Sequence, residues 1–516
     1  MTQPTRICVP VCEENLIALQ TAAKTAAEIG DLVEIRLDCL EGIEFEKATT
    51  SGLEVLAKSL LRPSIFTFRP SEEGGHRVAD YATRYAFWSS QQPIPSARFF
   101  DIEHDVVVGF VAANKTPLSR PDWSGVICST HDFVEMPDNL TEIYEQMANT
   151  PAQIVKVAVQ ADDVTDCVPM FQLLDRARNE GREIIALAMG NAGIATRILG
   201  PSRGAFLTYG SLESEKATAP GQITAEQLRS IYRIDKINEQ TLICGLVGMP
   251  VMHSVSPHAH NAAFDAMNLN GVYIPFEVRN VASFFTRMVH PRTREVDWKI
   301  RGLSITAPHK ASVMNCLDWI EPTAQAIGAV NTVVVEASRL LGYNTDAEGL
   351  IEPLTRKIGL VTDARVALIG AGGAARAAVW GLRQHKANVT IFARDLTKGR
   401  SFAEQIRSSC SPLEGASFAD FDIVINATPL GSAGEMINQT PATADQLHDA
   451  RLVYDLVYNP TDTKLLQEAR KAGCETLGGL EMLIAQAARQ FELWTAETAD
   501  QSVMHSAASY ALRARP

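Results

Sequence analysis

Short β-branched runs alternate with longer amphipathic stretches through the first 235 residues, and this alternation restricts the fold more than any other feature of the chain. Strands that alternate with helices pair in parallel, because each helix returns the chain to the starting edge of the sheet. Eight strands in this length predict a (β/α)8 barrel, with a doubly wound sheet as the alternative. The predicted strands are Ile7–Val11, Leu32–Leu37, Ser64–Phe68, Arg98–Ile102, Val126–Thr130, Ile154–Val159, Ile184–Met189 and Ala205–Tyr209.

Amphipathic segments between these strands, such as Leu16–Ile29 and Cys167–Asn179, predict the helices of the first domain. Thr224 is expected to open a further helix, because a threonine hydroxyl accepts hydrogen bonds from the free amides of a first turn. The short charged segment Arg233–Gln240 follows and marks a boundary, so we assign residues 1–235 to the first domain. A new strand is predicted at Leu242–Val247.

The 516 residues carry a formal net charge of −13, which gives no general attraction for nucleic acid or an acidic membrane surface. No apolar run approaches the length of a membrane-spanning helix. The nine cysteines include no Cys-x-x-Cys pair, so we expect neither a metal site nor a disulfide framework. The N-terminus lacks the pattern of a signal peptide or transit peptide, and a cytoplasmic location is the simplest interpretation.

Charged residues gather at the ends of the predicted strands of the first domain. Catalytic groups of a (β/α)8 barrel come from the C-terminal strand ends, so this placement predicts an active site. Glu34 and Arg36 lie two apart and point to the same face of their strand. The other members of this group are Arg69, Asp101, Glu103, His131, Lys156, Arg197 and Gln222.

Lys156 is the most informative residue of this group, because it lies within the apolar run IVKVAV. Desolvation favours the neutral amine, which is the form that attacks a carbonyl to make a Schiff base. A lysine that pairs with Glu34, or extends its charged end to solvent, is the structural alternative. The many charged groups on neighbouring strand ends favour the functional interpretation.

The segments EIRLD, FTFRPSEEGG, DIEHD, STHDF, IVKVAV and APGQ resemble, in this order, the signature segments of type I 3-dehydroquinate dehydratases. The resemblance covers residues 6–230 and implies a (β/α)8 fold that converts 3-dehydroquinate to 3-dehydroshikimate. It implies that Lys156 forms an imine with the substrate, that His131 moves protons and that Arg197 binds the carboxylate. The other implied substrate contacts are Glu34, Arg36, Arg69, Thr218 and Gln222.

The second half of the chain has its own polar motifs. VGMPVMHSVSPHAHN places Ser254 and Ser256 two apart, and a serine followed by Pro257 is typical of a helix N-cap. Hydroxyls, amides, one lysine and one carboxylate in this region suit a small polyhydroxylated acid. The remaining positions are Thr306, Lys310, Asn331, Asn344 and Asp346.

VALIGAGGAARAAV is the strongest local motif, in which a strand runs through Gly370-x-Gly372-x-x-Ala375 into a helix. Glycines let the backbone approach a pyrophosphate at a helix N-terminus, which indicates a Rossmann dinucleotide-binding domain. A connecting helix is expected before it, at Gly349–Leu360. The residues expected to bind the cofactor are Gly370, Ala371, Gly372, Gly373 and Ala374.

The second strand of this domain, VTIFARD, bears on the choice of cofactor. An acidic residue at its end would bind the ribose of NAD, but Ala393 stands there. Arg394 and Lys398 instead favour the 2′-phosphate of NADP, and Asp395 beside them is the one feature against it.

The ordered set HSVSPHAHN, SITAPHK, GAVNTV, GYNTDAEG, GAGGAAR, NATPLG, VYDLVYNP and GGLEMLIAQAA resembles shikimate dehydrogenases over residues 241–495. The resemblance implies a substrate domain at 241–345, completed by C-terminal helices at 480–516, and a Rossmann domain at 360–479. Lys310 and Asp346 match the catalytic pair of that family. The implied substrate contacts are Ser254, Ser256, Thr306, Asn331, Tyr458 and Gln486, and Thr428 and Gly479 match cofactor-side positions.

The two resemblances together predict a bifunctional enzyme that makes shikimate from 3-dehydroquinate, through 3-dehydroshikimate, with NADPH. We expect a monomer or homodimer with no nucleic-acid or membrane partner. A quinate/shikimate dehydrogenase in the second half is one alternative. A catalytically inert regulator that senses quinate is another, but it should have lost at least one of four residues that this chain retains. Those residues are His131, Lys156, Lys310 and Asp346.

Overall fold

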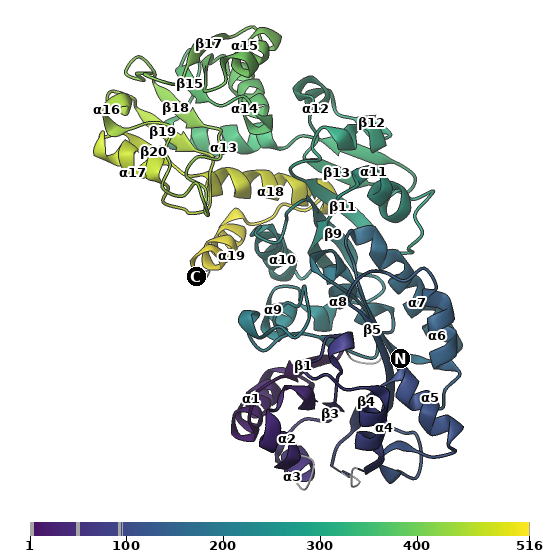
Figure 1. Ribbon diagram of the computed structural model, residues 1–516. Helices are drawn as coiled ribbons and strands as arrows, with labels where there is room; N and C mark the ends of the chain where they lie inside the picture. Colours follow the sequence, from purple (N-terminus) through teal and green to yellow (C-terminus); the bar gives the residue numbers. More distant parts are fainter. Residues whose placement is uncertain (1–4, 48–51, 91–93, 95, 515–516) are drawn as a thin grey trace. The chain divides into compact units, whose positions relative to one another are not determined.

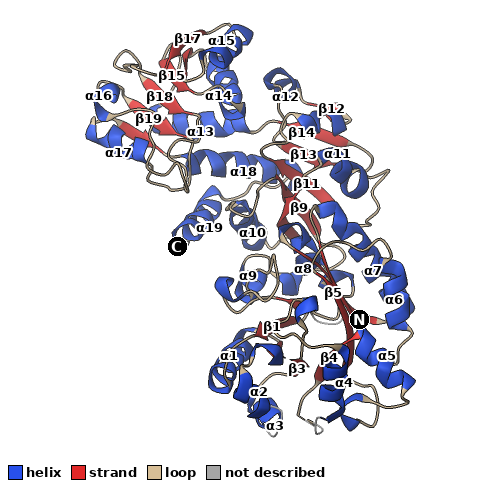
Figure 2. Cartoon of the chain, viewed as in Figure 1, coloured by secondary structure: helices blue, strands red, loops and turns tan. Residues whose placement is uncertain are grey.

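The protein is described by a computed structural model that covers residues 5–47, 52–90, 94 and 96–514 (Figures 1 and 2). Its contacts divide the chain into two compact units. The first unit consists of Met1–Ile243, Met249–Met252 and Asn270–Lys299. The second unit consists of Cys244–Gly248, His253–Leu269 and Ile300–Pro516.

Eight parallel strands form the sheet of the first unit, in the order β7-β6-β5-β4-β3-β2-β1-β8. A parallel bridge between Ile184 and Ala205 links β7 to the segment before β8, so the sheet meets itself as a barrel. This consecutive order confirms the (β/α)8 prediction, because a doubly wound sheet would reverse its order near the middle. The strands are β1 (Ile7–Val11), β2 (Leu32–Arg36), β3 (Ser64–Thr67), β4 (Phe99–Glu103), β5 (Val126–Asp132), β6 (Ile154–Gln160), β7 (Glu183–Met189) and β8 (Thr208–Tyr209).

Local signals set the ends of the barrel helices. The side chain of Asn15 accepts a hydrogen bond from the Ala18 amide at 2.9 Å and so begins α1 at Leu16. Thr224 and Gln227 form a capping box that opens α9, as the sequence predicts. The helices are α1 (Leu16–Ile29), α2 (Gly42–Lys47), α3 (Leu53–Ser59), α4 (Tyr81–Ser90), α5 (His104–Ala112), α6 (Leu140–Ala148), α7 (Cys167–Glu180), α8 (Ile194–Leu199) and α9 (Ala225–Ser230).

A second sheet has the strand order β10-β9-β11-β13-β14-β12. It is mixed: β13 runs antiparallel to both β11 and β14, and β12 runs parallel to β14. Its strands are β9 (Leu242–Gly248), β10 (Gly271–Glu277), β11 (Ile300–Ile305), β12 (Trp319–Ile320), β13 (Thr332–Val335) and β14 (Leu340–Tyr343). The accompanying helices are α10 (Ser256–Ala266), α11 (Val281–Phe284) and α12 (Pro322–Ile327).

The start of α10 corrects one expectation. Ser256 is the first helical residue rather than the N-cap, a position that Val255 occupies. The Ser254 hydroxyl accepts the Ser256 amide at 3.1 Å, so the capping function falls on the first serine of the pair. A side chain two residues earlier satisfies this amide because the turn before the helix folds back on it.

The third sheet is wholly parallel, with the order β17-β16-β15-β18-β19-β20 that is typical of a dinucleotide-binding fold. Its core includes Val366, Leu368, Ile391 and Ile425, each 0% exposed. The strands are β15 (Arg365–Ile369), β16 (Asn388–Ala393), β17 (Ser409–Pro412), β18 (Ile423–Asn426), β19 (Leu452–Asp455) and β20 (Glu475–Leu477). The helices are α14 (Gly373–Gln384), α15 (Leu396–Gln405), α16 (Ala444–Leu447) and α17 (Lys464–Lys471).

The helix expected at Gly349–Leu360 is α13, and it begins earlier, at Asp346, and ends at Ile358. The earlier start places the Asp346 carboxylate in the first turn, where the helix dipole favours a negative charge.

The C-terminal helices are α18 (Gly479–Thr495) and α19 (Gln501–Arg513). Gln490 of α18 is 1% exposed and accepts the Ser304 hydroxyl of β11 at 2.7 Å. Trp494 donates its indole N–H to the Val333 carbonyl of β13 at 3.1 Å. These bonds attach α18 to the mixed sheet. None of the helices that the structure describes is both long enough and apolar enough to cross a lipid bilayer.

Candidate active sites

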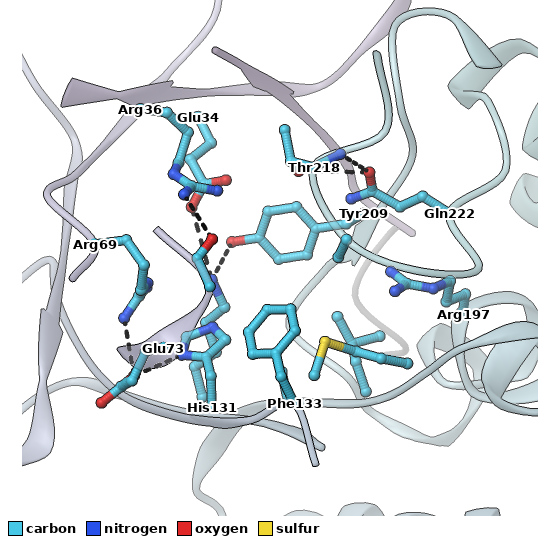
Figure 3. A pocket seen from close by; sticks show the side chains of 16 residues that line it. Glu34, Arg36, Arg69, Glu73, His131, Phe133, Arg197, Tyr209, Thr218 and Gln222 are labelled. Carbon is cyan, nitrogen blue, oxygen red and sulfur yellow. Dashed lines mark hydrogen bonds and ion pairs between the residues drawn. The ribbon is translucent and has the colours of Figure 1, made fainter. Parts of the chain in front are cut away.

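One pocket of the barrel is lined by all eight residues that the dehydratase resemblance assigns to the first site, whereas Asp101 and Glu103 of the predicted strand-end group are not among its lining residues (Figure 3). Arg36, Arg69 and His131 stand at or just after the C-terminal ends of their strands, whereas Glu34 and Lys156 lie within β2 and β6. Arg197 lies on α8, and Thr218 and Gln222 lie in the segment after β8. The eight residues are Glu34, Arg36, Arg69, His131, Lys156, Arg197, Thr218 and Gln222.

Lys156 is 5% exposed, on β6. Its ammonium Nζ lies 2.6 Å from Asp101 Oδ2 and 3.1 Å from the Tyr209 hydroxyl. Glu34, the partner considered from sequence, is farther away, with 3.7 Å between Lys156 Nζ and Glu34 Oε1. The lysine therefore has a fully buried acid partner, in addition to the apolar neighbours on its own strand.

Asp101 lies between two cations. Arg69 Nη2 approaches its Oδ1 at 2.6 Å, and Lys156 Nζ approaches its Oδ2. Burial alone would raise the pKa of Asp101, but Arg69 and Lys156 outweigh burial and hold the pKa well below its ordinary value. Arg69 also contacts Glu103 at 3.0 Å, and burial raises the pKa of Glu103 to about 8. The carboxylate of Asp101 thus stays ionised and orients Lys156.

His131 stands at the end of β5, and its Nδ1 atom lies 2.9 Å from Glu73 Oε2. The His131 ring stacks near Phe133, with 6.4 Å between the ring centroids. Burial, together with the nearby cations Arg69 and Lys156, lowers the pKa of His131. Burial raises the pKa of Glu73 to about 7. A neutral imidazole next to a carboxyl group that titrates near neutrality is suited to proton transfer.

Arg197 is 1% exposed, and burial lowers its pKa to about 10. Its Nη2 donates to the Pro220 carbonyl at 3.3 Å. Within the described part of the chain it has no ion pair, and its Nε has no hydrogen-bond partner. A buried guanidinium that faces a pocket without an acid partner is costly, so this geometry fits an anionic ligand.

Other polar groups around the pocket are already ordered by internal hydrogen bonds. Gln222 Oε1 accepts the Thr218 amide at 2.9 Å. Arg36 forms a two-point contact with Asp38, through Nε at 2.9 Å and Nη2 at 2.7 Å. These contacts fix polar groups at the pocket without exhausting their donors.

Sequence reasoning missed the two other ionisable residues that line this pocket. Glu73 lies in the same segment as Arg69, and Tyr209 ends the eighth strand. The rule that strand ends carry the site could have found Tyr209. Nothing in the sequence distinguishes Glu73 from Glu72 beside it, because only the fold brings one of them to His131.

In the second unit, the structure brings four of the predicted residues together. Lys310 Nζ lies 2.5 Å from Asp346 Oδ2. The Asn331 amide donates to Asp346 Oδ1 at 2.8 Å and to Gln486 Oε1 at 3.0 Å. Asp346 is 5% exposed, whereas the Lys310 side chain is 28% exposed. The Asp346 carboxylate is thus held by the Asn331 amide and contacts Lys310, whose side chain is partly exposed to solvent.

The other predicted substrate residues have separate contacts. The Ser254 hydroxyl donates to the Ser256 hydroxyl at 3.0 Å. Thr306 follows β11, where its amide donates to the Val247 carbonyl at 2.9 Å. Tyr458 is half-buried after β19.

The glycine loop has the predicted strand–turn–helix form, between β15 and α14. Gly370 adopts φ 118°, and a Cβ there would lie 3.1 Å from Thr428 Cγ2. Around Gly372 and Gly373 the space where a Cβ would stand is open, with no heavy atom within 4 Å. A Cβ on Gly479 would meet the Leu456 carbonyl oxygen. The loop thus leaves the start of α14 open, as phosphate groups require.

Asp395 has a structural role in a helix start, which the sequence did not indicate. Its Oδ1 accepts the amides of Thr397 at 3.0 Å and Lys398 at 3.1 Å, so it is the N-cap of α15. Lys398 Nζ lies 3.9 Å from Asp395 Oδ2. Arg394 is exposed after β16. The carboxylate is partly neutralised by these donors, which reduces its repulsion of a phosphate.

Family models match almost the whole chain. The model of type I 3-dehydroquinase matches residues 7–239. The model of the shikimate dehydrogenase substrate-binding domain matches residues 246–333, and that of shikimate/quinate 5-dehydrogenase matches residues 353–464. The model of the shikimate 5′-dehydrogenase C-terminal domain matches residues 479–508.

Known proteins resemble the chain over the same regions. The chloroplastic bifunctional 3-dehydroquinate dehydratase/shikimate dehydrogenase of Arabidopsis thaliana is 34% identical, over 95% of this chain and 82% of its own length. The shikimate dehydrogenase (NADP(+)) of Caldanaerobacter subterraneus subsp. tengcongensis is 39% identical, over 52% of this chain and 97% of its own. A crystal structure of a shikimate dehydrogenase in complex with NADP+ is 37% identical with a TM-score of 0.50, and covers 54% of this chain and 97% of its own. The chain therefore belongs to the family of bifunctional 3-dehydroquinate dehydratase/shikimate dehydrogenases.

Proposed function

We propose that the barrel dehydrates 3-dehydroquinate through an imine on Lys156, and that the second unit reduces the resulting 3-dehydroshikimate to shikimate with NADPH. The observation that carries the first step is the buried Lys156 in one pocket with the His131–Glu73 pair and with Arg197, which has no acid partner among the described residues. A nucleophile, a proton carrier and an anion-binding group are the parts that such a reaction needs.

In the barrel, the Lys156 amine attacks the substrate ketone, and loss of water gives the imine. The cationic imine withdraws electrons and acidifies the neighbouring C–H bond, from which His131 removes a proton. The same residue then returns the proton to the departing hydroxyl, which leaves as water. Hydrolysis of the imine releases the product and restores Lys156. Asp101 stabilises the positive nitrogen throughout, at 2.6 Å from Nζ.

Arg197 supplies the contact for the substrate carboxylate in this proposal, because a guanidinium matches a carboxylate at two points. Arg36 and Arg69 would bind ring hydroxyls at one side of the substrate. Thr218 and Gln222 would bind ring hydroxyls at its other side. Glu34 would orient these groups, since it accepts the Thr67 hydroxyl at 2.8 Å while lying 3.7 Å from Lys156.

In the second unit, Lys310 donates the proton that the substrate oxygen needs as the ketone is reduced, and Asp346 orients Lys310. The open space at Gly372 and Gly373 fits the pyrophosphate of a dinucleotide, which would supply the hydride. Arg394 and Lys398 would bind the 2′-phosphate. The proposed remaining cofactor contacts are Gly370, Ala371, Ala374, Thr428 and Gly479, and the proposed substrate contacts are Ser254, Ser256, Thr306, Asn331, Tyr458 and Gln486.

The proposed domain organisation follows from these sites. Residues 1–235 form the dehydratase. Residues 241–345 form the substrate domain of the dehydrogenase, and residues 480–516 complete it. Residues 360–479 form the cofactor domain. The contacts of Gln490 and Trp494 with the mixed sheet support the assignment of the C-terminal helices to the substrate domain. One chain that carries two sequential activities raises the local concentration of the intermediate.

The test mixes the purified protein with 3-dehydroquinate and NADPH and follows the loss of NADPH absorbance. Oxidation of NADPH without added dehydratase supports both activities, and its absence overturns the combined proposal. Borohydride reduction in the presence of 3-dehydroquinate should then attach the substrate to Lys156, as located by peptide mass spectrometry. Attachment to any other lysine would refute the imine assignment.

A further inference from the structure

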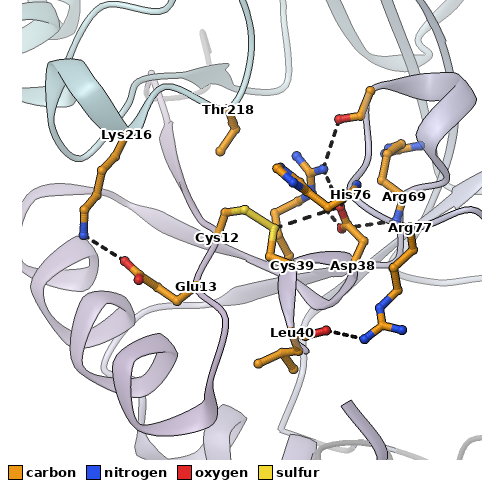
Figure 4. Close-up of a disulfide and its surroundings, with 12 residues drawn as sticks. Cys12, Glu13, Asp38, Cys39, Leu40, Arg69, His76, Arg77, Lys216 and Thr218 are labelled. Atoms are coloured by element: carbon orange, nitrogen blue, oxygen red, sulfur yellow. Dashed lines mark hydrogen bonds and ion pairs between the residues drawn. A yellow bond between two sulfur atoms is a disulfide. The ribbon is translucent and has the colours of Figure 1, made fainter. Parts of the chain in front are cut away.

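Cys12 and Cys39 form a disulfide, although the sequence led us to expect no disulfide framework (Figure 4). Cys12 follows β1, and Cys39 ends the short 3-10 helix Leu37–Cys39 after β2. Their Cα atoms are 5.4 Å apart, a normal separation for this bond. The bond therefore joins the first two loops at the end of the barrel that carries the catalytic residues.

Asp38, the neighbour of Cys39, connects this bond to the pocket. Its two carboxylate oxygens hold Arg36 at 2.9 Å and 2.7 Å. Asp38 also accepts the amide of Arg69 at 3.3 Å and that of His76 at 3.1 Å. Asp38 is 2% exposed, so no solvent competes for these bonds. Because Asp38 is the neighbour of Cys39, the position of the Cys39 backbone influences how well the Arg36 side chain is ordered at the pocket.

The disulfide is reachable from outside. Cys12 is half-buried, and both cysteines line a second pocket with Glu13, His76 and Arg77. The other seven cysteines are free. Cys8 and Cys167 are 0% exposed, and burial raises the pKa of both thiols, which keeps them unreactive. Access and pairing therefore distinguish Cys12 and Cys39 from the buried cysteines of the barrel.

We propose that Cys12 and Cys39 are a thiol–disulfide exchange site that sets the affinity of the dehydratase pocket for its substrate. The inference rests on the proposed dehydratase function. In the oxidised form the bond holds the loop after β2, and Asp38 keeps Arg36 in its binding position. In the reduced form this loop is freer and Arg36 is less well ordered, so substrate binding weakens.

The exchange partners are a low-molecular-weight thiol and its disulfide. In reduction, an external thiolate attacks the sulfur of Cys12, which is the more exposed of the two, and Cys39 leaves as a thiolate. A second external thiol then displaces Cys12, and the two external thiols end as one disulfide. Two electrons pass to the protein sulfurs, and two protons come from the external thiols. Oxidation reverses these steps.

Other contacts between the two loops persist in the reduced form, so the effect is limited. The Glu41 amide donates to the Glu14 carbonyl at 2.9 Å, independently of the sulfurs. We therefore expect KM for 3-dehydroquinate to rise about fivefold on reduction, near the lower end of common coupling effects. We expect kcat to change little, because Lys156 and His131 lie on other strands.

The experiment measures kcat and KM for dehydration by the full chain in oxidised and in reduced glutathione, each with EDTA. EDTA is needed because Cys12, Cys39 and His76 place possible ligand atoms within 4.8 Å of one another, the one such group among the described residues. Thiol titration after unfolding should count seven thiols in the oxidised sample, and nine in the reduced one. If KM is the same in a sample with seven thiols and in one with nine, the proposal is wrong. It is also wrong if reduction does not change the number of thiols.

Activity in neither sample would instead show that the proposed dehydratase function is wrong. The Cys12→Ser variant should have the KM of the reduced protein in both buffers. The matched control is Cys316→Ser, a half-buried free cysteine of the second unit, which should keep the full response. A redox response that persists in Cys12→Ser, or is lost in Cys316→Ser, would contradict the assignment. Should Cys12→Ser fail to fold, the wild-type comparison decides alone.

Discussion

Nδ1 of His131 lies 2.9 Å from Oε2 of Glu73, and burial moves the pKa values of these two groups in opposite directions. The pKa of His131 falls and that of Glu73 rises to about 7, so the imidazole stays neutral while the carboxyl group changes charge near neutrality. An ionised Glu73 makes His131 a stronger base, since it stabilises the imidazolium that forms as the proton is taken.

The pH dependence of the dehydratase should show this coupling. As pH rises through about 7, Glu73 loses its proton and kcat should increase. Glu73→Gln keeps a hydrogen-bond acceptor for His131 but cannot ionise, so the step near pH 7 should disappear and kcat should fall about tenfold. Steady-state rates from pH 5 to 9 measure both effects. If Glu73→Gln retains the rise in kcat near pH 7, another group causes that rise. Coupled groups share their apparent pKa values, so the wild-type profile alone does not identify the group.

Arg197→Met should lower kcat/KM for 3-dehydroquinate by about a hundredfold, through KM, because it removes a charged hydrogen-bonding partner of the carboxylate. Its melting temperature should not fall, because the variant replaces a buried cation that has no acid partner among the described residues by an apolar side chain of similar length. Arg176→Met, at a half-buried arginine of α7 that does not line the pocket, is the control and should leave kcat/KM unchanged. A large loss of stability in Arg197→Met would indicate a structural role.

Lys310→Met should reduce the dehydrogenase rate about a thousandfold, since it removes the proton donor of the reaction. Asp346→Asn should reduce it less, because an amide still accepts from Asn331 but no longer attracts the lysine. Each variant should dehydrate 3-dehydroquinate at the wild-type rate, which also verifies folding. If either variant lost both activities, this would contradict the proposal that the two active sites work independently.

Arg394→Ala should raise KM for NADPH about tenfold and leave KM for NADH unchanged, because only NADPH carries the 2′-phosphate. Arg400→Ala, at an exposed residue of α15, the helix that follows Arg394, should raise KM for NADPH less. If both cofactors respond equally to Arg394→Ala, the arginine does not recognise the phosphate.

Shikimate should be preferred to quinate as the oxidation substrate, since quinate carries an additional ring hydroxyl and needs a larger pocket. Ser254, Ser256 and Thr306 leave less room than glycine or alanine would. The measurement is kcat/KM for each acid with NADP+. A strong preference for quinate would reassign the second activity.

The sequence alone determined the eight barrel strands, the strand–turn–helix of the glycine loop and the capping of α9. Each depends on neighbours in the chain: alternation of apolar residues, glycines beside a helix start, and a threonine three residues before its glutamine partner. The strand-end rule also collected Arg36, Arg69 and His131, because a closed parallel barrel brings all C-terminal strand ends to one side.

Only the tertiary structure decided which charges meet. Asp101 lies 55 residues from Lys156, and Glu73 lies 58 from His131. The pairing of Cys12 with Cys39 likewise depends on adjacent loops rather than on spacing. Side-chain partners at such separations depend on strand order and register, in which a shift of one residue would turn every side chain to the other face. Local sequence patterns do not encode that register. The partners of Lys156 and His131, and the lack of an acid partner for Arg197 among the described residues, therefore became known only from the fold.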